Sequence, residues 1–293
     1  MSRREPRRIL DENAELLRTR EDSLKERRLA LLWDRAALLG EIRAGNLADG
    51  EFIADLREGG GGFESLLPDE RIAFSRILAR RAGLPAQTGR EALSLLFPSD
   101  GTEEGDDLIA YLRSSYTDRA FRLFGTLLPE PRAVYPTSFA AVCEEVYYNR
   151  ARYCILPIEN SEEGSLHSFR LLIAKYELKI AAVCDVPTSE EGITRFALLH
   201  KNVRLPEGAG EICFRFTFAV SPYDLPLDEV LAAVRQFGLS LHSVESVPLG
   251  YTDIAVGYDI TALVGEGDLF ALLTYLFCFV PQFDAVGVYP RVG

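Results

Sequence analysis

Apolar side chains in the first 45 residues recur at the three- and four-residue spacing of an amphipathic helix. The run includes Leu16, Leu17, Leu24 and Leu31, and no glycine precedes Gly40. The pattern predicts one helix of about forty residues. Because a small domain cannot cover so long an apolar stripe, we expect this helix to pair with a second copy of the chain.

Two shorter helices are expected next, separated by a glycine run. The first covers residues 49–58 and ends at the four glycines of 59–62, which favour a flexible loop. The second begins at Pro68 and continues to about Ala82, because proline and acidic residues suit a first helical turn.

The pattern changes near residue 93, where short apolar runs alternate with amphipathic ones. Strands are expected at 93–97, 133–135, 153–158, 179–184 and 195–199, and helices at 106–124, 137–149 and 165–176. Alternation of this kind indicates an α/β layer. After a linker at 205–210, the expected order is strand 213–220, helix 227–237, strands 241–247 and 253–260, helix 268–279 and strand 283–289. This βαββαβ order is typical of a ferredoxin-like domain.

The patterns therefore predict a multi-domain α+β protein. Its expected parts are an N-terminal all-α helical segment (1–88), a central single-lobe α/β domain (89–205) and a C-terminal ferredoxin-like domain (210–293).

Charge and composition narrow the possible partners. The net charge of −12 arises almost entirely after residue 90, so nucleic acids and anionic membranes are not expected partners. The five cysteines have no CxxC spacing and the three histidines are far apart, so we expect buried free thiols, no metal and no cofactor. No apolar run is long enough to cross a bilayer and no secretory leader is evident, so we expect a cytoplasmic protein.

Two motifs point to a specific chemistry. Residues 156–161 read Leu-Pro-Ile-Glu-Asn-Ser, and residues 194–196 read Thr-Arg-Phe. Together they resemble the signature of prephenate dehydratase, which decarboxylates and dehydrates prephenate to phenylpyruvate. The resemblance implies catalytic roles for two sets of residues. They are Glu159, Asn160 and Ser161, and Thr194, Arg195 and Phe196. Thr194 would assist the departing ring hydroxyl, since the reaction needs a positioned acid and donors aimed at developing charge.

The spacing of these motifs argues against dehydratase activity. In the family that this chain resembles, the substrate lies between two lobes, and the second lobe precedes the Thr-Arg-Phe motif. Here residues 185–193 close that gap directly, and such a short segment cannot form half of a cleft. The loop at 98–104 also carries acidic residues where the resemblance implies small polar ones. We therefore expect Glu159, Asn160 and Ser161 to cap the helix at Ser165 and to satisfy backbone groups.

The N-terminal segment resembles the helical chorismate mutase domain that precedes the dehydratase in bifunctional proteins. The resemblance implies that Arg18 and Arg35 bind the two carboxylates of chorismate. It places Asn46 three turns after Arg35, on the same helical face, where the family has a lysine. Glu51 or Asp55 would supply an acidic contact.

The C-terminal segment resembles an ACT domain, an amino-acid-sensing module. Residues 244–248 read Val-Glu-Ser-Val-Pro, close to the Glu-Ser-Arg-Pro motif of that family, and residues 225–227 replace its Gly-Ala-Leu turn. The implied ligand contacts are Leu225, Leu227, Glu245, Ser246 and Pro248. A domain that only dimerises is the alternative.

The three resemblances occur in the order found in bifunctional proteins of phenylalanine biosynthesis. Two readings remain open. One is weak chorismate mutase activity, which converts chorismate to prephenate and needs no nucleophile or metal. The other is a catalytically inactive regulatory or scaffolding protein, a pseudoenzyme that binds an aromatic amino acid. In both, the expected assembly is a homodimer through the N-terminal helix and the ACT-like domain.

Overall fold

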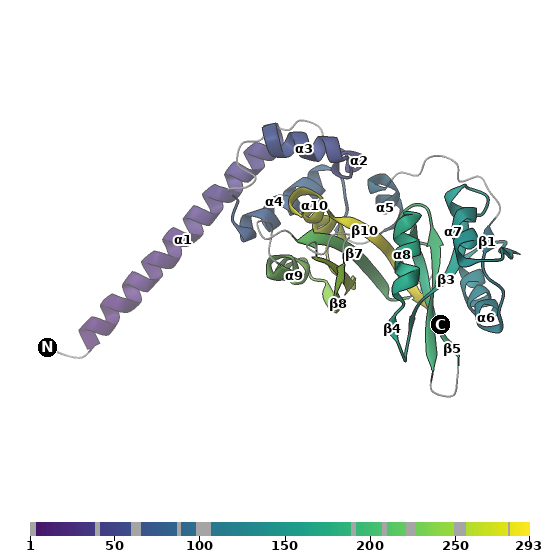
Figure 1. Cartoon of the computed structure of the whole chain (residues 1–293). Coiled ribbons are helices and arrows are strands. Elements are labelled where there is room, and N and C mark those ends of the chain that lie inside the picture. The colour runs from purple at the N-terminus through teal and green to yellow at the C-terminus, as the bar shows by residue number, and fades with distance from the viewer. Residues whose placement is uncertain are drawn as a thin grey trace.

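The computed structural model describes residues 4–38, 42–59, 66–86, 89–97, 107–188, 192–206, 210–220, 227–248, 256–280 and 282–293. The loop at 98–104, most of the glycine run at 59–62, and Leu225 lie outside the described residues. Figure 1 shows a long helix projecting from a body in which helices surround one twisted sheet.

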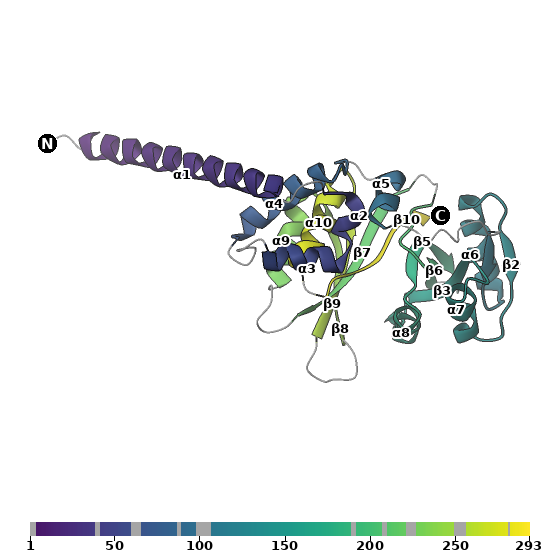
Figure 2. The same ribbon diagram turned by 90° about the horizontal axis from the view of Figure 1, so that it is seen from above.

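The N-terminal part is helical, as predicted. Helix α1 (Arg4–Leu38) is followed by α2 (Ala44–Leu47), α3 (Gly50–Gly59) and α4 (Pro68–Arg81). The N-terminal part of α1 projects away from the body (Figures 1 and 2). Its leucines at 16, 17, 24 and 31 are 59–67% exposed, so α1 carries an uncovered apolar surface.

Two predicted elements are wrong. Residues 93–97 belong mainly to helix α5 (Arg90–Leu96), in which Leu93 and Leu96 share a buried face at helical spacing. The helix expected at 106–124 is instead strand β1 (Leu108–Ala110) followed by α6 (Ser115–Phe124). The Ser114 side chain accepts a hydrogen bond from the Thr117 amide and thereby sets the start of α6.

The remaining central elements lie close to their predicted positions. They are η1 (Gly125–Leu127), β2 (Arg132–Val134), α7 (Phe139–Tyr147), β3 (Tyr153–Asn160), β4 (Gly164–Ser165), α8 (His167–Lys175), β5 (Lys179–Pro187) and β6 (Ile193–His200). The C-terminal elements follow the predicted order: β7 (Ile212–Val220), α9 (Leu227–Gln236), β8 (Ser240–Pro248), β9 (Val256–Leu263), α10 (Leu269–Phe279) and β10 (Asp284–Val292).

The described strands form one sheet in the order β2-β1-β3-β6-β5-β10-β7-β9-β8, with β4 paired to β3. Strands β2, β1 and β3 run parallel, and β6 lies antiparallel between β3 and β5. The last strand, β10, joins the two halves because it pairs with β5 on one side and β7 on the other. This join requires Gly287, since a Cβ there would collide with the Ile180 carbonyl oxygen.

Apolar side chains alternate between the two faces of this sheet, so each face has its own helices. Leu156 packs in a core with residues of α7 and α8, whereas its neighbour Ile155 packs in a core with α6. A third core joins α9 and α10 to residues from 42–96, including Phe74 of α4. All five cysteines are buried free thiols, as predicted.

Candidate functional site

The two dehydratase-like motifs meet on neighbouring strands. In the antiparallel ladder between β3 and β6, Glu159 lies opposite Arg195 and Asn160 lies opposite Thr194. Phe196 lies opposite Pro157 and is buried. The structure thus brings together residues that are more than thirty positions apart in the chain.

Side chains of the Glu-Asn-Ser turn accept hydrogen bonds from backbone amides of the turn and of β6, and they do not cap a helix. The Asn160 side-chain oxygen accepts hydrogen bonds from the amides of Glu162 and Glu163, which shapes the turn into β4. Ser161 Oγ accepts from the Ile193 amide at 3.0 Å. The predicted cap on the following helix is wrong, because β4 intervenes and α8 begins after Leu166 without a side-chain cap.

A hairpin stands where the resemblance implies a second lobe. Strands β5 and β6 pair along their length, and the Thr188 amide donates to the Gly192 carbonyl at 2.8 Å. Thr194 Oγ1 lies 3.4 Å from Thr188 Oγ1, and Tyr116 donates to the Thr188 carbonyl. The hydroxyl expected to assist catalysis therefore faces its own hairpin.

Arg195 is held by carboxylates of the chain. Its guanidinium donates to Asp185 at 2.8 and 3.1 Å and to Glu159 at 2.7 Å. Arg291 adds a 3.0 Å bond to Asp185. Burial acts to raise the pKa of Asp185, but the bonds and charges of Arg195 and Arg291 hold that pKa below its usual range. We call these four side chains the Arg195 network.

A second set of charged side chains lies on the same face of the sheet, beyond β10. Arg215 of β7 and Asp259 of β9 form a bidentate pair with two bonds of 2.8 Å. Arg170 of α8 donates to Ser165 Oγ at 2.9 Å and to Glu245 at 2.6 Å. Glu245, expected to contact a ligand, thus pairs with α8. These five residues form the Arg215 cluster.

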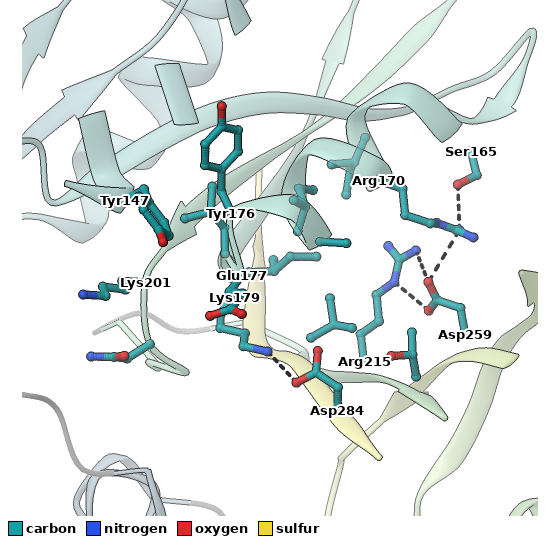
Figure 3. A pocket seen from close by; sticks show the side chains of 18 residues that line it. Tyr147, Ser165, Arg170, Tyr176, Glu177, Lys179, Lys201, Arg215, Asp259 and Asp284 are labelled. Carbon is teal, nitrogen blue, oxygen red and sulfur yellow. Dashed lines mark hydrogen bonds and ion pairs between the residues drawn. The ribbon is translucent and has the colours of Figure 1, made fainter. Parts of the chain in front are cut away.

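A narrow cavity connects the two sets, lined by Glu159, Arg195, Arg215, His242 and Glu245 among others. A larger cavity of about 500 Å³ lies beside it, under α8 (Figure 3). Sequence reasoning missed Arg170, Arg215 and Asp259. The sequence pattern gave no signal for Arg215, because Phe214 and Phe216 pack on the other face of the sheet and a charged residue between them is typical of a solvent-facing position.

The residues predicted for chorismate binding lie in separate elements. Arg18 is exposed on α1, and the side chain of Arg35 lies outside the described part. The shared helical face predicted for Asn46 is wrong, because α1 ends at Leu38 and Asn46 belongs to α2. Leu47 is fully buried and anchors α2 in the core. Glu51 is exposed at the start of α3.

The remaining predicted ligand contacts surround α9 and β8. Leu227 is half-buried at the start of α9, Ser246 is exposed, and Pro248 ends β8. Within the described ranges, no cluster of three His, Cys, Asp or Glu side chains suits a metal ion. No helix among the described residues is both long and apolar enough to span a membrane.

Comparison with known proteins agrees with the central motifs. Residues 109–191, under a third of the chain, match the family model of prephenate dehydratase. No curated protein sequence matches the chain. Among solved structures, prephenate dehydratase from Streptococcus mutans is similar with a TM-score of 0.53 and 22% identity, over 64% of this chain and 99% of that chain. GqqA, described as a novel type of quorum quenching acylase, is similar with a TM-score of 0.50 and 23% identity, over 64% of this chain and 96% of that chain.

At these identities the structural matches establish a shared fold. The chorismate mutase and ACT resemblances stay predictions. The central part of the chain is a prephenate dehydratase-like domain, which points to phenylalanine biosynthesis.

Proposed function

We propose that this protein is a relative of prephenate dehydratase that has no dehydratase activity and serves phenylalanine biosynthesis in a regulatory or scaffolding role. The observation that carries the proposal is the β5–β6 hairpin. It occupies the place where the resemblance requires a second lobe, so the described residues supply no second wall for the substrate cleft. Without that wall, water reaches the substrate and hydrogen-bond donors lose most of their strength.

The state of Arg195 supports the same proposal. A guanidinium that binds the prephenate dianion has to leave its present partners, and here it is held by Asp185 and Glu159. Both carboxylates would then repel the incoming substrate, since like charges a few ångströms apart in a partly buried site cost about 4 kcal/mol. On this proposal, the residues of the motif stabilise the hairpin and form ion pairs, and they take no part in catalysis.

The test of this proposal is the formation of phenylpyruvate from prephenate by the purified full-length chain. We expect a rate equal to the protein-free background. Phenylpyruvate formation that is abolished in Arg195→Gln and unchanged in Arg150→Gln would show an intact dehydratase site. Arg150 is a suitable control because it is exposed and pairs only locally with Glu145 and Tyr148.

Chorismate mutase activity is the second candidate. Arg18 is an exposed arginine on a helix that projects from the body and carries uncovered leucines. If two copies pair through α1, Arg18 of one chain would approach the helices of the other, and the site would be shared. In a chorismate-consumption assay, this candidate requires activity that Arg18→Ala removes and Arg20→Ala leaves intact. Arg20 is an apt control because it is also exposed but lies about 160° around the helix.

A further inference from the structure

The cavity under α8 has the size and apolar lining of a small-molecule site. It lies at the join between the two halves of the sheet, between α8 and residues of β3, β5, β7 and β10. Its volume of about 500 Å³ falls within the range of pockets that hold small organic ligands. Its apolar walls come from Ile158, Ile173, Ile180 and Val286. An apolar body that replaced water along these walls would remove apolar surface from water, which favours binding.

The charges of the lining cancel one another. Three ion pairs with bonds of 2.6–2.8 Å join lining cations to carboxylates, and Figure 3 shows those of Arg215 and Lys179. The pairs are Arg215 with Asp259, Arg170 with Glu245, and Lys179 with Asp284. Two further lining residues, Lys201 and Glu177, add one charge of each sign. A charged ligand would therefore leave water without meeting a net opposite charge in the cavity.

The end of the cavity away from the Arg215 cluster combines aromatic rings with an open polar group. Tyr147 and Tyr176 meet edge to face there, with ring centroids 5.8 Å apart (Figure 3). The backbone amide of Asn202, which also lines the cavity, donates to His200 Nδ1 at 2.9 Å. Its side chain has no hydrogen-bond partner among the described residues. An amide side chain can both donate to and accept from an uncharged polar group, and the rings suit an aromatic body.

We propose that this cavity binds an uncharged aromatic compound that carries one polar group. The aromatic body would lie along Ile173 and Ile180, beside Tyr147 and Tyr176, and the polar group would bond to the Asn202 side chain. The balanced charges set the specificity, because a charged counterpart of the same shape would lose its hydration without compensation. The site is separate from the Arg195 network, so it stands whether or not the protein dehydrates prephenate.

The test is calorimetry of the full-length protein with indole-3-acetamide and with indole-3-acetate, which have nearly the same shape but differ in charge. We expect the amide to bind at least tenfold more tightly than the acid. Asn202→Ala should weaken binding of the amide at least threefold, because it removes the group that bonds to the ligand. Ala174→Trp should weaken it at least tenfold, because Ala174 is an exposed lining residue and a larger ring there narrows the entrance.

Two control variants separate ligand binding from structural damage. Ser168→Trp places the same ring at an exposed position of α8 outside the cavity lining, so it should keep the affinity of the wild type. Arg150→Gln removes an exposed arginine outside the cavity and should also have no effect. Unfolding curves of all four variants establish that each one is folded.

Three results would each overturn the proposal. The first is no binding heat from millimolar indole-3-acetamide. The second is an acid that binds as tightly as the amide. The third is an Asn202→Ala or Ala174→Trp variant that is folded and binds the amide as the wild type does. The prephenate assay enters none of these outcomes, so this proposal and the proposed function can fail separately.

Discussion

At the scale of single residues, charge is compensated in small groups rather than left available. The Arg195 network joins two guanidinium groups to two carboxylates through four bonds of 2.7–3.1 Å. The dehydratase-like motif could be read from the sequence, because its residues are local. The ion pairs that these residues form could not be predicted from the sequence, because Asp185 and Arg291 come from strands that only the tertiary fold brings beside Arg195.

Loss of Arg195 should therefore cost stability. Arg195→Gln removes the cation that pairs with Glu159 and leaves Asp185 with Arg291 as its remaining cation, and we expect the free energy of unfolding to fall by about 1–3 kcal/mol. Urea unfolding measures this. Arg150→Gln should change the same quantity by less than about 0.5 kcal/mol. Equal effects of the two variants would mean that the network does not stabilise the fold.

Two aspartates should show opposite dependence on pH. The pKa of Asp185 is held below its usual value by Arg195 and Arg291 despite burial, so its contribution to stability is complete above the unfolded pKa and is lost as pH falls through the folded pKa. The pKa of Asp268 is raised, chiefly by burial. Its contribution is therefore present below the unfolded pKa and is lost as pH rises through the folded pKa.

The matching asparagine variants test these signs. Asp185→Asn should be less stable than the wild type at pH 7, and the difference should shrink as pH falls below about 4. Asp268→Asn keeps a side-chain oxygen that can accept from the Ala271 amide, and it removes the charge that burial disfavours, so it should be more stable than the wild type at pH 7. Urea unfolding at several pH values measures both. Differences that do not vary with pH would contradict the assigned causes.

At the scale of elements, hydrophobic periodicity predicted most helices and strands close to their observed positions. It failed where a short apolar run fits both periods, as at 93–97, and where a strand and a helix follow each other without a glycine or proline, as at 106–124. The long N-terminal helix was the clearest prediction. Within the described chain, few other residues pack against this helix. One contact is the 3.0 Å ion pair between Arg28 and Glu70 of α4.

The exposed leucines of α1 should mediate self-association. Leu17, Leu24 and Leu31 recur every seven residues and are 60–67% exposed, a spacing that suits pairing with another helix. In sedimentation velocity, we expect the wild type to be a dimer at micromolar concentration and Leu17→Asp/Leu24→Asp to be a monomer with an unchanged circular dichroism spectrum. Glu15→Gln/Glu21→Gln is the matched control and should stay dimeric. A wild-type monomer, or a dimeric leucine variant, would count against this role for α1.

At the scale of the whole molecule, one sheet runs through the dehydratase-like part and the ferredoxin-like part, joined by β5 and β10. The βαββαβ order could be predicted from the sequence. The cavity at the join could not, because Arg170, Arg215 and Asp259 come from both sides of the linker at 205–210. Under the proposed function, resemblance and activity are separate, because the motifs are kept while a hairpin stands where the resemblance implies a cleft wall.

The assay that bears most directly on this separation follows prephenate and phenylpyruvate after prephenate is added to the full-length protein at pH 7.5. We predict that phenylpyruvate forms only at the rate of the protein-free control, and that Arg195→Gln gives the same trace as the wild type. Phenylpyruvate formed in proportion to wild-type protein, and lost in Arg195→Gln, would show that a single lobe with this hairpin suffices for the dehydration and would overturn the proposed function.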